Sequence, residues 1–495
     1  MTRDDGVRRR EAAALGIDVG TTEVKAGLVT LDGRLLALAR RRHTSDADPA
    51  NGRAEQDPDA WWAGIAGAVR EVMADERSAA AEIVGLAVDG HGPTLTPVDA
   101  AGHPTRPAIT WQDTRSVPDA AALSAATGLG GWGLGVLSAA RWLEREEPGA
   151  AAGTRWYLNS WEALALRLTG RAGSFVVAGQ SALPIDSLAG TGLATERLAP
   201  AHEAGTTLGP LTPGAAAELG LAAGTPVVAG IVDAYASFHG ARMVARGDAI
   251  DVGGAAGGFG LYWDESLDAA GSFSGPAPLP GLWVIGGAMA ATGAALDWFR
   301  DAVLGGRLST RELIAEAAAV PAGANGLVFL PYLAGERSPL WDPAARGAFA
   351  GLTLRHGHAE MARAILEASA LALRHVAAGI IDAGGRVETM RVCGGPARSG
   401  AWNQLKADVT GFSIEVPRVL ETAVVGSAIV AATGVGAHPD LPTAIRAMAA
   451  IDHRLEPDPS RHETYERLFE AYVALHPAIS PIIGRLAPMP SRAIP

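Results

Sequence analysis

The chain has 495 residues, 48% of them hydrophobic and 19% charged, so it is too long for a single core, and two domains of about 200–250 residues are expected. A net charge of −12 argues against nucleic acid or an anionic membrane as a partner, because either surface would need clustered Lys and Arg. The lone Cys393 excludes an intramolecular disulfide framework, and without an unbroken apolar run of membrane-spanning length the composition predicts a cytoplasmic protein that acts on small molecules.

The first predicted element is a three-stranded antiparallel meander over residues 15–38. The apolar run LGIDV turns at Gly20-Thr21-Thr22 and resumes as a second strand, and Asp32-Gly33 is a strong hairpin signal before a third. A strand after the glycine turn excludes a P-loop and a dinucleotide fingerprint, which both open a helix. The amides and hydroxyls of the turn are suited to a phosphate, and Asp18 to magnesium. A hairpin without a ligand is the alternative.

Further along the first half, helical and extended patterns alternate. Trp61, Trp62 and the apolar residues that follow have helical spacing, and residues 83–88 form a buried strand that ends at Asp89-Gly90-His91. Ligands sit at such strand ends in α/β sheets. A short strand over residues 108–111 delivers Trp111 to a loop.

The second half repeats the opening pattern. Residues 250–254, Ile-Asp-Val-Gly-Gly, echo residues 17–21, Ile-Asp-Val-Gly-Thr, and strands flank a glycine-rich turn in both places. This predicts a duplication, with coincidence in a chain of 62 glycines as the alternative. A long helix over residues 359–379 follows, then a strand at 390–393 that feeds Gly394-Gly395, and a helix from 399 to 410. We place the domain boundary in the Gly- and Arg-rich stretch 240–247, which gives domains 1–243 and 244–495.

These patterns together resemble the FGGY family of carbohydrate kinases, in its xylulokinase-like branch. Seven segments carry the resemblance, in the order expected for the family: residues 15–28, 54–62, 108–116, 224–241, 331–352, 363–375 and 392–411. The resemblance implies an α/β protein of two duplicated ribonuclease-H-like domains, of the actin-like ATPase superfamily, with ATP and a sugar bound in a cleft between them. It also implies Mg²⁺ as a cofactor.

The resemblance further implies roles for individual residues. Asp233, in Gly230-Ile231-Val232-Asp233, would be the general base near the sugar hydroxyl and the metal. The alternative is that it is only the N-cap of a helix over 234–241. Asp18 would hold magnesium. The remaining matches fall into three groups: Gly20, Thr21, Thr22, Lys25, Gly254 and Ala255 at the phosphates; Gly394, Gly395, Ala397 and Asn403 at the adenosine; and Asp89, Gly90, His91 and Trp111 at the sugar.

Three departures from the family pattern bear on activity. Gly254-Ala255-Ala256 stands where the second phosphate loop usually carries Gly-Thr-Ser, so both hydroxyls are missing. Ala139 replaces a lysine that is thought peripheral. Asp89-Gly90 replaces the Gln-Met of xylulokinases, which predicts a wider pocket floor with a carboxylate acceptor and favours a neutral ligand.

The leading interpretation is an ATP-dependent kinase of a neutral sugar or polyol, most simply the ketopentose D-xylulose, acting on a terminal hydroxyl. A kinase of glycerol or a tetritol is one alternative. A catalytically weak sugar-binding or regulatory protein is another, supported by Ala255 and Ala256. An actin-like or heat-shock-type ATPase is a third, and the motif at 332–339 speaks against it. The oligomeric state stays open, with a homodimer as one candidate.

Overall fold

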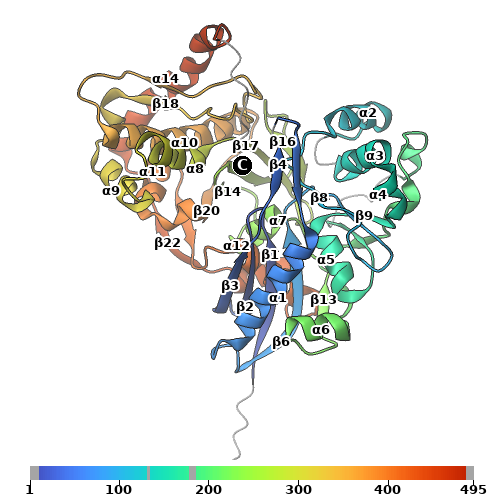
Figure 1. The fold of residues 1–495 in the computed structure, drawn as a ribbon. Helices are drawn as coiled ribbons and strands as arrows, with labels where there is room; N and C mark the ends of the chain where they lie inside the picture. Colours follow the sequence, from blue (N-terminus) through green and yellow to red (C-terminus); the bar gives the residue numbers. More distant parts are fainter. Residues whose placement is uncertain (1–9, 49, 131–133, 178–184, 487–495) are drawn as a thin grey trace, which may run out of the picture. The chain divides into compact units, whose positions relative to one another are not determined.

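The computed structural model describes residues 10–48, 50–130, 134–177 and 185–486, and the chain divides into two compact units (Figure 1). Unit 1 comprises Met1–Gly240 and Ala423–Ala449, and unit 2 comprises Ala241–Thr422 and Ala450–Pro495. The boundary expected at 243/244 assigns residues 423–449 to the second domain, whereas they belong to unit 1 here. This segment contributes an apolar helix, α12 (Thr422–Gly434), and the central strands of unit 1 need such a cover because they are buried on both faces.

Unit 1 is built on a six-stranded mixed sheet in the order β12-β13-β6-β1-β2-β3. Strands β1, β2 and β3 are antiparallel, while β6 pairs parallel with both β1 and β13. The predicted meander and the predicted strand at 83–88 are therefore confirmed. The strands are β1 (Glu11–Val19), β2 (Glu23–Thr30), β3 (Leu35–Arg42), β6 (Ala81–Gly90), β12 (Thr207–Pro210) and β13 (Pro226–Val228).

Helices pack on both faces of this sheet. The helix α1 (Pro58–Ala74) has Pro at its start and Asp57 as N-cap, and it packs on β2 and β3 (Figure 1). Trp61 and Trp62 are among its buried residues. On the other face α12 approaches β1 so closely that a Cβ on Gly16 would lie 2.0 Å from the carbonyl oxygen of Val424. Glycine is therefore required at position 16 for strand and helix to meet.

The rest of unit 1 consists of short strands and helices that extend from the sheet. Among them, β5 pairs with β4 and β8 in a three-stranded sheet. The short strands are β4 (Asp46–Asp48), β5 (Arg53–Gln56), β7 (Thr96–Val98), β8 (Ala108–Ile109), β9 (Trp156–Leu158), β10 (Ser174–Val176) and β11 (Ala201–Glu203). The remaining helices are α2 (Val117–Thr127), α3 (Leu137–Glu146), α4 (Pro148–Gly153), α5 (Ser160–Thr169), α6 (Pro213–Leu219), α7 (Asp233–Gly240) and α13 (Leu441–Met448).

Unit 2 repeats the sheet of unit 1, which confirms the predicted duplication. Its order is β16-β17-β15-β14-β20-β21-β22, in which β14, β15 and β17 are antiparallel and β20 pairs parallel with β14 and β21. In reverse, the order is β22-β21-β20-β14-β15-β17-β16, which matches the order of unit 1 strand by strand, with β16 added at the end. The strand β14 takes the place of β1. The strands are β14 (Asp248–Gly253), β15 (Gly257–Trp263), β16 (Phe273–Pro276), β17 (Trp283–Met289), β20 (Thr389–Gly394), β21 (Ile414–Pro417) and β22 (Ile451–Leu455).

The core of unit 2 forms around α10 (His358–Asp382), the long helix expected at 359–379. This helix is long and apolar enough to cross a membrane by length and composition, but most of it is buried against its neighbours, as expected for a core helix. The other elements of unit 2 are α8 (Thr292–Trp298), the π-helix at Phe299–Val303, α9 (Thr310–Ala319), β18 (Val328–Leu330), β19 (Ala348–Ala350), α11 (Gly400–Thr410) and α14 (Pro459–Ile483).

We predict that Gly16→Ala destabilises unit 1. The added methyl must push α12 away from β1, and such overpacking costs about 1–3 kcal/mol. Gly214→Ala, in α6, is the matched control, because no atom lies within 4 Å of the added Cβ. That variant should gain up to about 1 kcal/mol from the reduced entropy of the unfolded chain. Urea denaturation followed by tryptophan fluorescence measures both, and equal effects of the same sign would contradict the packing argument.

Candidate active site

The first predicted phosphate loop is the turn between β1 and β2, and its backbone is held from several sides. The amide of Gly20 donates to the carbonyl of Glu23 (3.1 Å), which closes the turn. Asp18 and Lys25 are register partners across the hairpin, and the Lys25 ammonium lies 2.9 Å from the Asp18 carboxylate. Thr22 is exposed and Gly20 and Thr21 are half-buried, so the turn is accessible to a ligand.

Three carboxylates converge beside this loop, because the parallel strands β1, β6 and β13 deliver their carboxyl ends to one edge of the sheet. Asp18 and Asp89 are register partners in β1 and β6, and a parallel bridge between Gly90 and Val232 brings Asp233 next to them. Asp18 and Asp89 are buried, whereas Asp233 keeps accessible surface. Of the three, Asp233 is thus the one that a ligand can reach.

The proximity of these acids shifts their protonation. Burial, together with the negative charge of Asp18, raises the pKa of Asp233 to about 7, although the Ala234 amide and Lys25 act in the opposite direction. Burial first, and then Asp18, raises the pKa of Asp89 well above its usual range. Its Oδ2 accepts a hydrogen bond from the Ser427 hydroxyl of α12, so this acid is bonded within the protein.

The surroundings of Asp89 and Gly90 do not support the sugar-side roles expected for them. Asp89 is fully buried, and its Oδ2 is bonded to Ser427, so its carboxyl group does not face an open pocket. Gly90 is also buried, and a Cβ placed there would lie 2.4 Å from the Ser160 hydroxyl at the start of α5. The space beside Gly90 is filled by α5, so the glycine does not widen a pocket floor.

Both ring nitrogens of His91, which was predicted to bind the sugar, have partners within the protein. Its Nδ1 lies 2.9 Å from the Thr94 hydroxyl and its Nε2 lies 3.2 Å from Oε1 of Gln56. The ring is 1% exposed, and burial lowers its pKa to about 3, so it is neutral. The expected donation from His91 to a sugar oxygen is therefore wrong for this structure, and His91 has a structural role.

Trp111 keeps the exposure that a sugar-stacking residue needs. Its side chain is 40% exposed, on the loop that follows β8. Its indole N–H donates to the Thr21 hydroxyl (3.2 Å), so Trp111 lies directly against the first phosphate loop. The structure thus brings Asp18, Thr21, Lys25, Trp111 and Asp233 together in unit 1.

In unit 2 the second predicted phosphate loop joins β14 and β15. Ala255 is exposed and Gly254 is half-buried, and the carbonyl of Ala255 accepts from the amide of Ala294 in α8 (2.9 Å). Asp251, the counterpart of Asp18, is buried and paired with the equally buried ammonium of Lys406. The lysine that pairs with Asp251 is buried, whereas Lys25, which pairs with Asp18 in the first loop, keeps some exposure.

The predicted adenosine residues divide into two groups. Gly394 has a left-handed φ of 76°, and a Cβ there would lie 1.9 Å from the carbonyl oxygen of Gly253, so glycine lets the ends of β14 and β20 meet. Gly395 is exposed to a ligand. Ala397 and Asn403 are both buried, and Asn403 donates to the Ala397 carbonyl (2.8 Å). Asn403 therefore holds the backbone of the loop at Ala397, and the positions of both residues near the adenosine stay a prediction.

Sequence reasoning missed Gln56, Ser427, Ser160 and Lys406. Gln56 lies in segment 54–62, which carries part of the family resemblance. The sequence of that segment does not indicate that the side chain of Gln56 reaches Thr21 in the first phosphate loop. Ser427 and Lys406 are far in sequence from the acids they contact. A polar residue within an otherwise apolar helical segment, as at Ser427, was the available signal.

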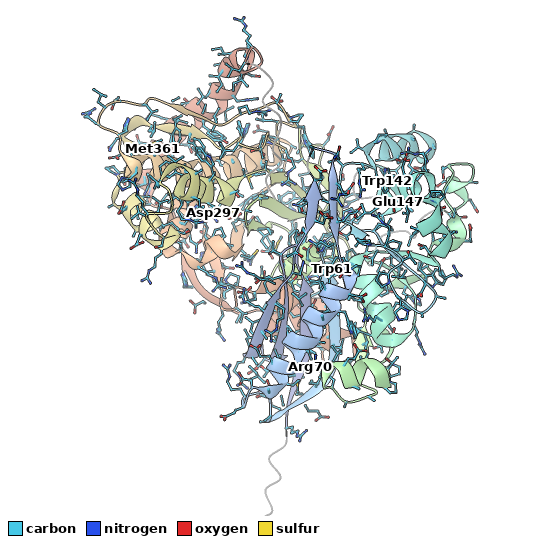
Figure 2. The ribbon with its side chains drawn as sticks, viewed as in Figure 1. Trp61, Arg70, Trp142, Glu147, Asp297 and Met361 are labelled. Atoms are coloured by element: carbon cyan, nitrogen blue, oxygen red, sulfur yellow. The ribbon has the colours of Figure 1, made fainter. Side chains whose placement is uncertain are left out.

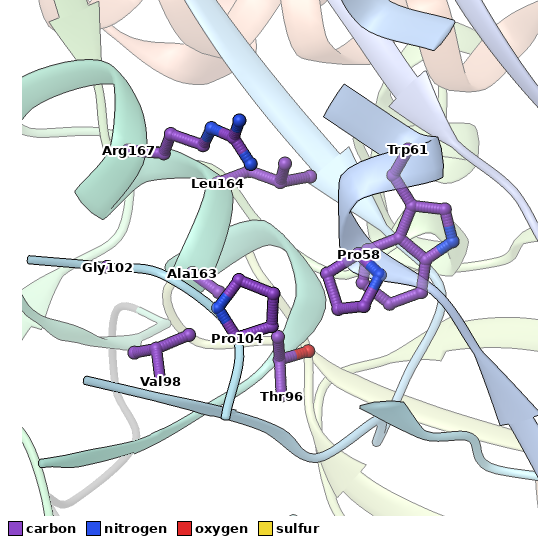
Figure 3. A pocket seen from close by; sticks show the side chains of 9 residues that line it. All are labelled: Pro58, Trp61, Thr96, Val98, Gly102, Pro104, Ala163, Leu164 and Arg167. Carbon is purple, nitrogen blue, oxygen red and sulfur yellow. The ribbon is translucent and has the colours of Figure 1, made fainter. Parts of the chain in front are cut away.

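A small pocket in unit 1 lies apart from these residues. It is lined by Pro58, Trp61, Thr96, Val98, Gly102, Pro104, Ala163, Leu164 and Arg167 (Figure 3). None of the predicted site residues lines it, and its walls are mainly apolar. Trp61, which projects from α1 (Figure 2), separates this pocket from Gln56 and His91, which its indole contacts.

The residues of unit 1 fit a magnesium ion that arrives with a nucleotide. Mg²⁺ usually takes one or two carboxylates and completes its octahedron with phosphate oxygens and water. Asp18 and Asp233 offer two carboxylates beside the loop. Within the described residues no group of three or more His, Cys, Asp or Glu side chains could hold a metal by itself. The site therefore suits a metal shared with phosphates, not a metal held by the protein alone.

Models of one protein family match both halves of the chain. The N-terminal domain of the FGGY family of carbohydrate kinases matches residues 13–240, and the C-terminal domain matches residues 253–435. The chain belongs to the FGGY family of carbohydrate kinases. It is thus a sugar kinase by family, with the actin-like ATPase fold in two α/β domains.

Individual relatives of this FGGY kinase carry different substrate names. It is 29% identical to a xylulose kinase of Escherichia coli over 95% of this chain and 100% of the relative. It is 27% identical to a gluconokinase of Bacillus licheniformis over 94% of this chain and 96% of the relative. The crystal structure of a xylulose kinase from Rhodospirillum rubrum matches with a TM-score of 0.81 and 31% identity, covering 96% of this chain and all of that one.

We predict that Lys406→Met destabilises unit 2 severely. The change leaves Asp251 buried without its counter-charge, and breaking a buried pair in this way costs about 3–5 kcal/mol. The double variant Lys406→Met/Asp251→Leu removes both charges and should recover most of the loss. Chemical denaturation measures the three free energies of unfolding. A single variant as stable as the wild type would show that Asp251 does not depend on Lys406.

Proposed function

We propose that this kinase transfers the γ-phosphoryl group of ATP to a terminal hydroxyl of a neutral sugar or polyol, with D-xylulose as the leading substrate. The observation that carries the proposal is the position of Asp233. Asp233 is half-buried, its carboxyl is close enough to Asp18 for that charge to raise its pKa, and Asp18 itself lies just before the loop at Gly20–Thr22. A base and a phosphate-binding turn at one sheet edge are what an in-line transfer to an alcohol requires.

In this mechanism Asp233 accepts the proton of the attacking hydroxyl. Gly20 closes the turn through its bond to Glu23, and the amide of Thr21 and the side chains of Thr22 and Lys25 bind the transferring phosphoryl group. Asp18, with Asp233, would hold the magnesium ion that comes with ATP, and this ion supplies charge neutralisation at the β- and γ-phosphates. Trp111 covers the carbon face of the sugar, because its exposed ring adjoins Thr21.

In unit 2 we propose that backbone carries the nucleotide contacts. The amides of Gly254 and Ala255 would bind phosphate without side-chain hydroxyls, and Gly394 and Gly395 would let the backbone approach the adenosine. The first domain then supplies the base, the first loop and the sugar contacts, and the second domain supplies the second loop and the adenosine contacts. We propose that the enzyme works in the cytoplasm on small molecules, without nucleic acid or membrane as partner.

The identity of the sugar rests on the relatives and not on the pocket electrostatics. Xylulose kinase is the name of the E. coli and R. rubrum relatives, which supports a ketopentose. Asp89 does not face a ligand, so it no longer argues against sugar acids, and the gluconokinase relative makes gluconate the second candidate. A coupled ADP-release screen over D-xylulose, L-xylulose, glycerol, tetritols and gluconate tests the proposal, and turnover on none of them would refute it.

We expect Asp233→Asn to lower turnover by at least about a hundredfold, as for loss of a positioned general base. The amide keeps the side-chain oxygen that the Ala234 amide contacts, so the fold and the sugar affinity should persist. Asp440→Asn is the matched control, because Asp440 is the N-cap of α13 and asparagine caps equally well. Steady-state kinetics measures both variants. Unchanged turnover of a folded Asp233→Asn protein would place the base elsewhere.

We expect Ala255→Thr to keep activity or to tighten ATP binding. Ala255 is exposed, so a threonine fits, and its hydroxyl restores one charge-assisted hydrogen bond worth up to about 1.5–3 kcal/mol. Isothermal titration with AMPPNP and Mg²⁺ gives the dissociation constant. An inactive wild type that becomes active with Ala255→Thr would instead support the catalytically weak sugar-binding protein.

A further inference from the structure

Gln56, the last residue of β5, is buried between the first phosphate loop and the sugar side of unit 1. It is 2% exposed, and its amide makes four hydrogen bonds. Nε2 donates to the Thr21 carbonyl (2.8 Å) and to the Ser45 hydroxyl (2.6 Å). Oε1 accepts from the indole N–H of Trp61 (2.9 Å) and lies 3.2 Å from Nε2 of His91. Both donors and both acceptor positions of the amide are filled.

The chemistry of these partners fixes the orientation of the amide. An indole N–H only donates, so the atom of Gln56 that faces Trp61 must be the oxygen. His91 then carries its proton on Nε2, and its Nδ1 accepts from the Thr94 hydroxyl. The nitrogen of Gln56 consequently points at Thr21. A flipped amide would set its nitrogen against the indole N–H of Trp61 and its oxygen against the Thr21 carbonyl and would lose both bonds, so Gln56 holds Thr21 in one arrangement.

The strand β5 also supports Trp111, the residue that contacts the side chain of Thr21. Gln56 is the register partner of Ala108 in β8, the strand that leads to Trp111. The hydroxyl of Thr110, next to Trp111, donates to the Ala54 carbonyl of β5 (3.0 Å). Trp111 in turn donates to the Thr21 hydroxyl. Thr21 is therefore held at its carbonyl by Gln56 and at its side chain by Trp111, and β5 anchors both.

We propose that Gln56 is a positioning residue that holds the first phosphate loop in register with Trp111, so that the γ-phosphate of ATP is bound in line with the sugar. The proposal rests on the proposed kinase function. Gln56 touches neither substrate and acts through the Thr21 carbonyl. Its loss should weaken binding of the γ-phosphate and leave the adenosine and β-phosphate contacts in place.

Two variants separate this role from simple core stability. In Gln56→Glu the carboxylate still accepts from Trp61 and His91, but it cannot donate to Thr21 and repels its carbonyl. In Gln56→Met a chain of similar length loses all four bonds. Thr212→Ala, which removes the N-cap of α6 in the same unit, is the control for a general loss of stability.

The readout is the dissociation constant of AMPPNP with Mg²⁺ divided by that of ADP with Mg²⁺, measured by isothermal titration. We expect both Gln56 variants to weaken AMPPNP by about tenfold, the value of one hydrogen bond to a phosphate-binding loop, with ADP within about twofold. The KM for ATP should rise while the KM for the sugar changes little in Gln56→Glu. Thr212→Ala should leave the ratio unchanged.

A ratio that stays at the wild-type value in both Gln56 variants would overturn the proposal, as would equal weakening of both nucleotides. If Gln56→Glu does not fold, the ratio of the AMPPNP and ADP dissociation constants in Gln56→Met tests the proposal by itself. Failure of the proposed function is a separate outcome, because a wild type that phosphorylates no sugar in the screen still gives the nucleotide ratio. A wild type that binds neither nucleotide would overturn both proposals.

Discussion

The parallel pairing of β6 with β1 is the constraint on which the candidate site depends. It sets Asp18 beside Asp89, and the neighbouring strand β13 then carries the chain to Asp233. Three acids so close together are tolerable only if their total negative charge is reduced. Burial raises the pKa of Asp89, which favours its protonated form, and Lys25 pairs with Asp18. The negative charge that remains lies at the accessible edge, where a metal and phosphates are expected.

The duplicated unit uses the same sheet with a different charge balance. Asp251 occupies the place of Asp18, but a buried lysine neutralises it, whereas the lysine beside Asp18 retains some exposure. The two acids are equally buried, but the Lys25 side chain is 18% exposed and the Lys406 side chain only 5%, so Lys25 has more room to move from its acid to a phosphate. The first hairpin is therefore the better candidate for metal and phosphoryl chemistry, and the second contributes mainly backbone.

The candidate site is held together by polar side chains that are not expected to touch a substrate. Three such residues each bond to one group of the candidate site. Gln56 bonds to the Thr21 carbonyl, Thr94 to the His91 ring, and Ser427 to the Asp89 carboxyl group. A buried amide or hydroxyl without such a partner would be costly, so these bonds restrict the site to one arrangement. Trp111 is exposed, whereas Asp89 and Gly90, which distinguish this chain from the xylulokinase pattern, are buried at the strand end.

The sequence by itself determined the strand-turn-strand hairpins, the duplication and the family, because alternating apolar runs, glycine turns and ordered motifs are local signals. It also placed Asp18, Thr21 and Asp233 correctly at strand ends. Only the tertiary structure decided which of these positions reach a ligand. Asp89 is covered by Ser427, 338 residues away, Gly90 by Ser160, and Asn403 is turned inward to Ala397. Exposure and hydrogen-bond partners are set by packing between distant segments, and a local pattern does not contain that information.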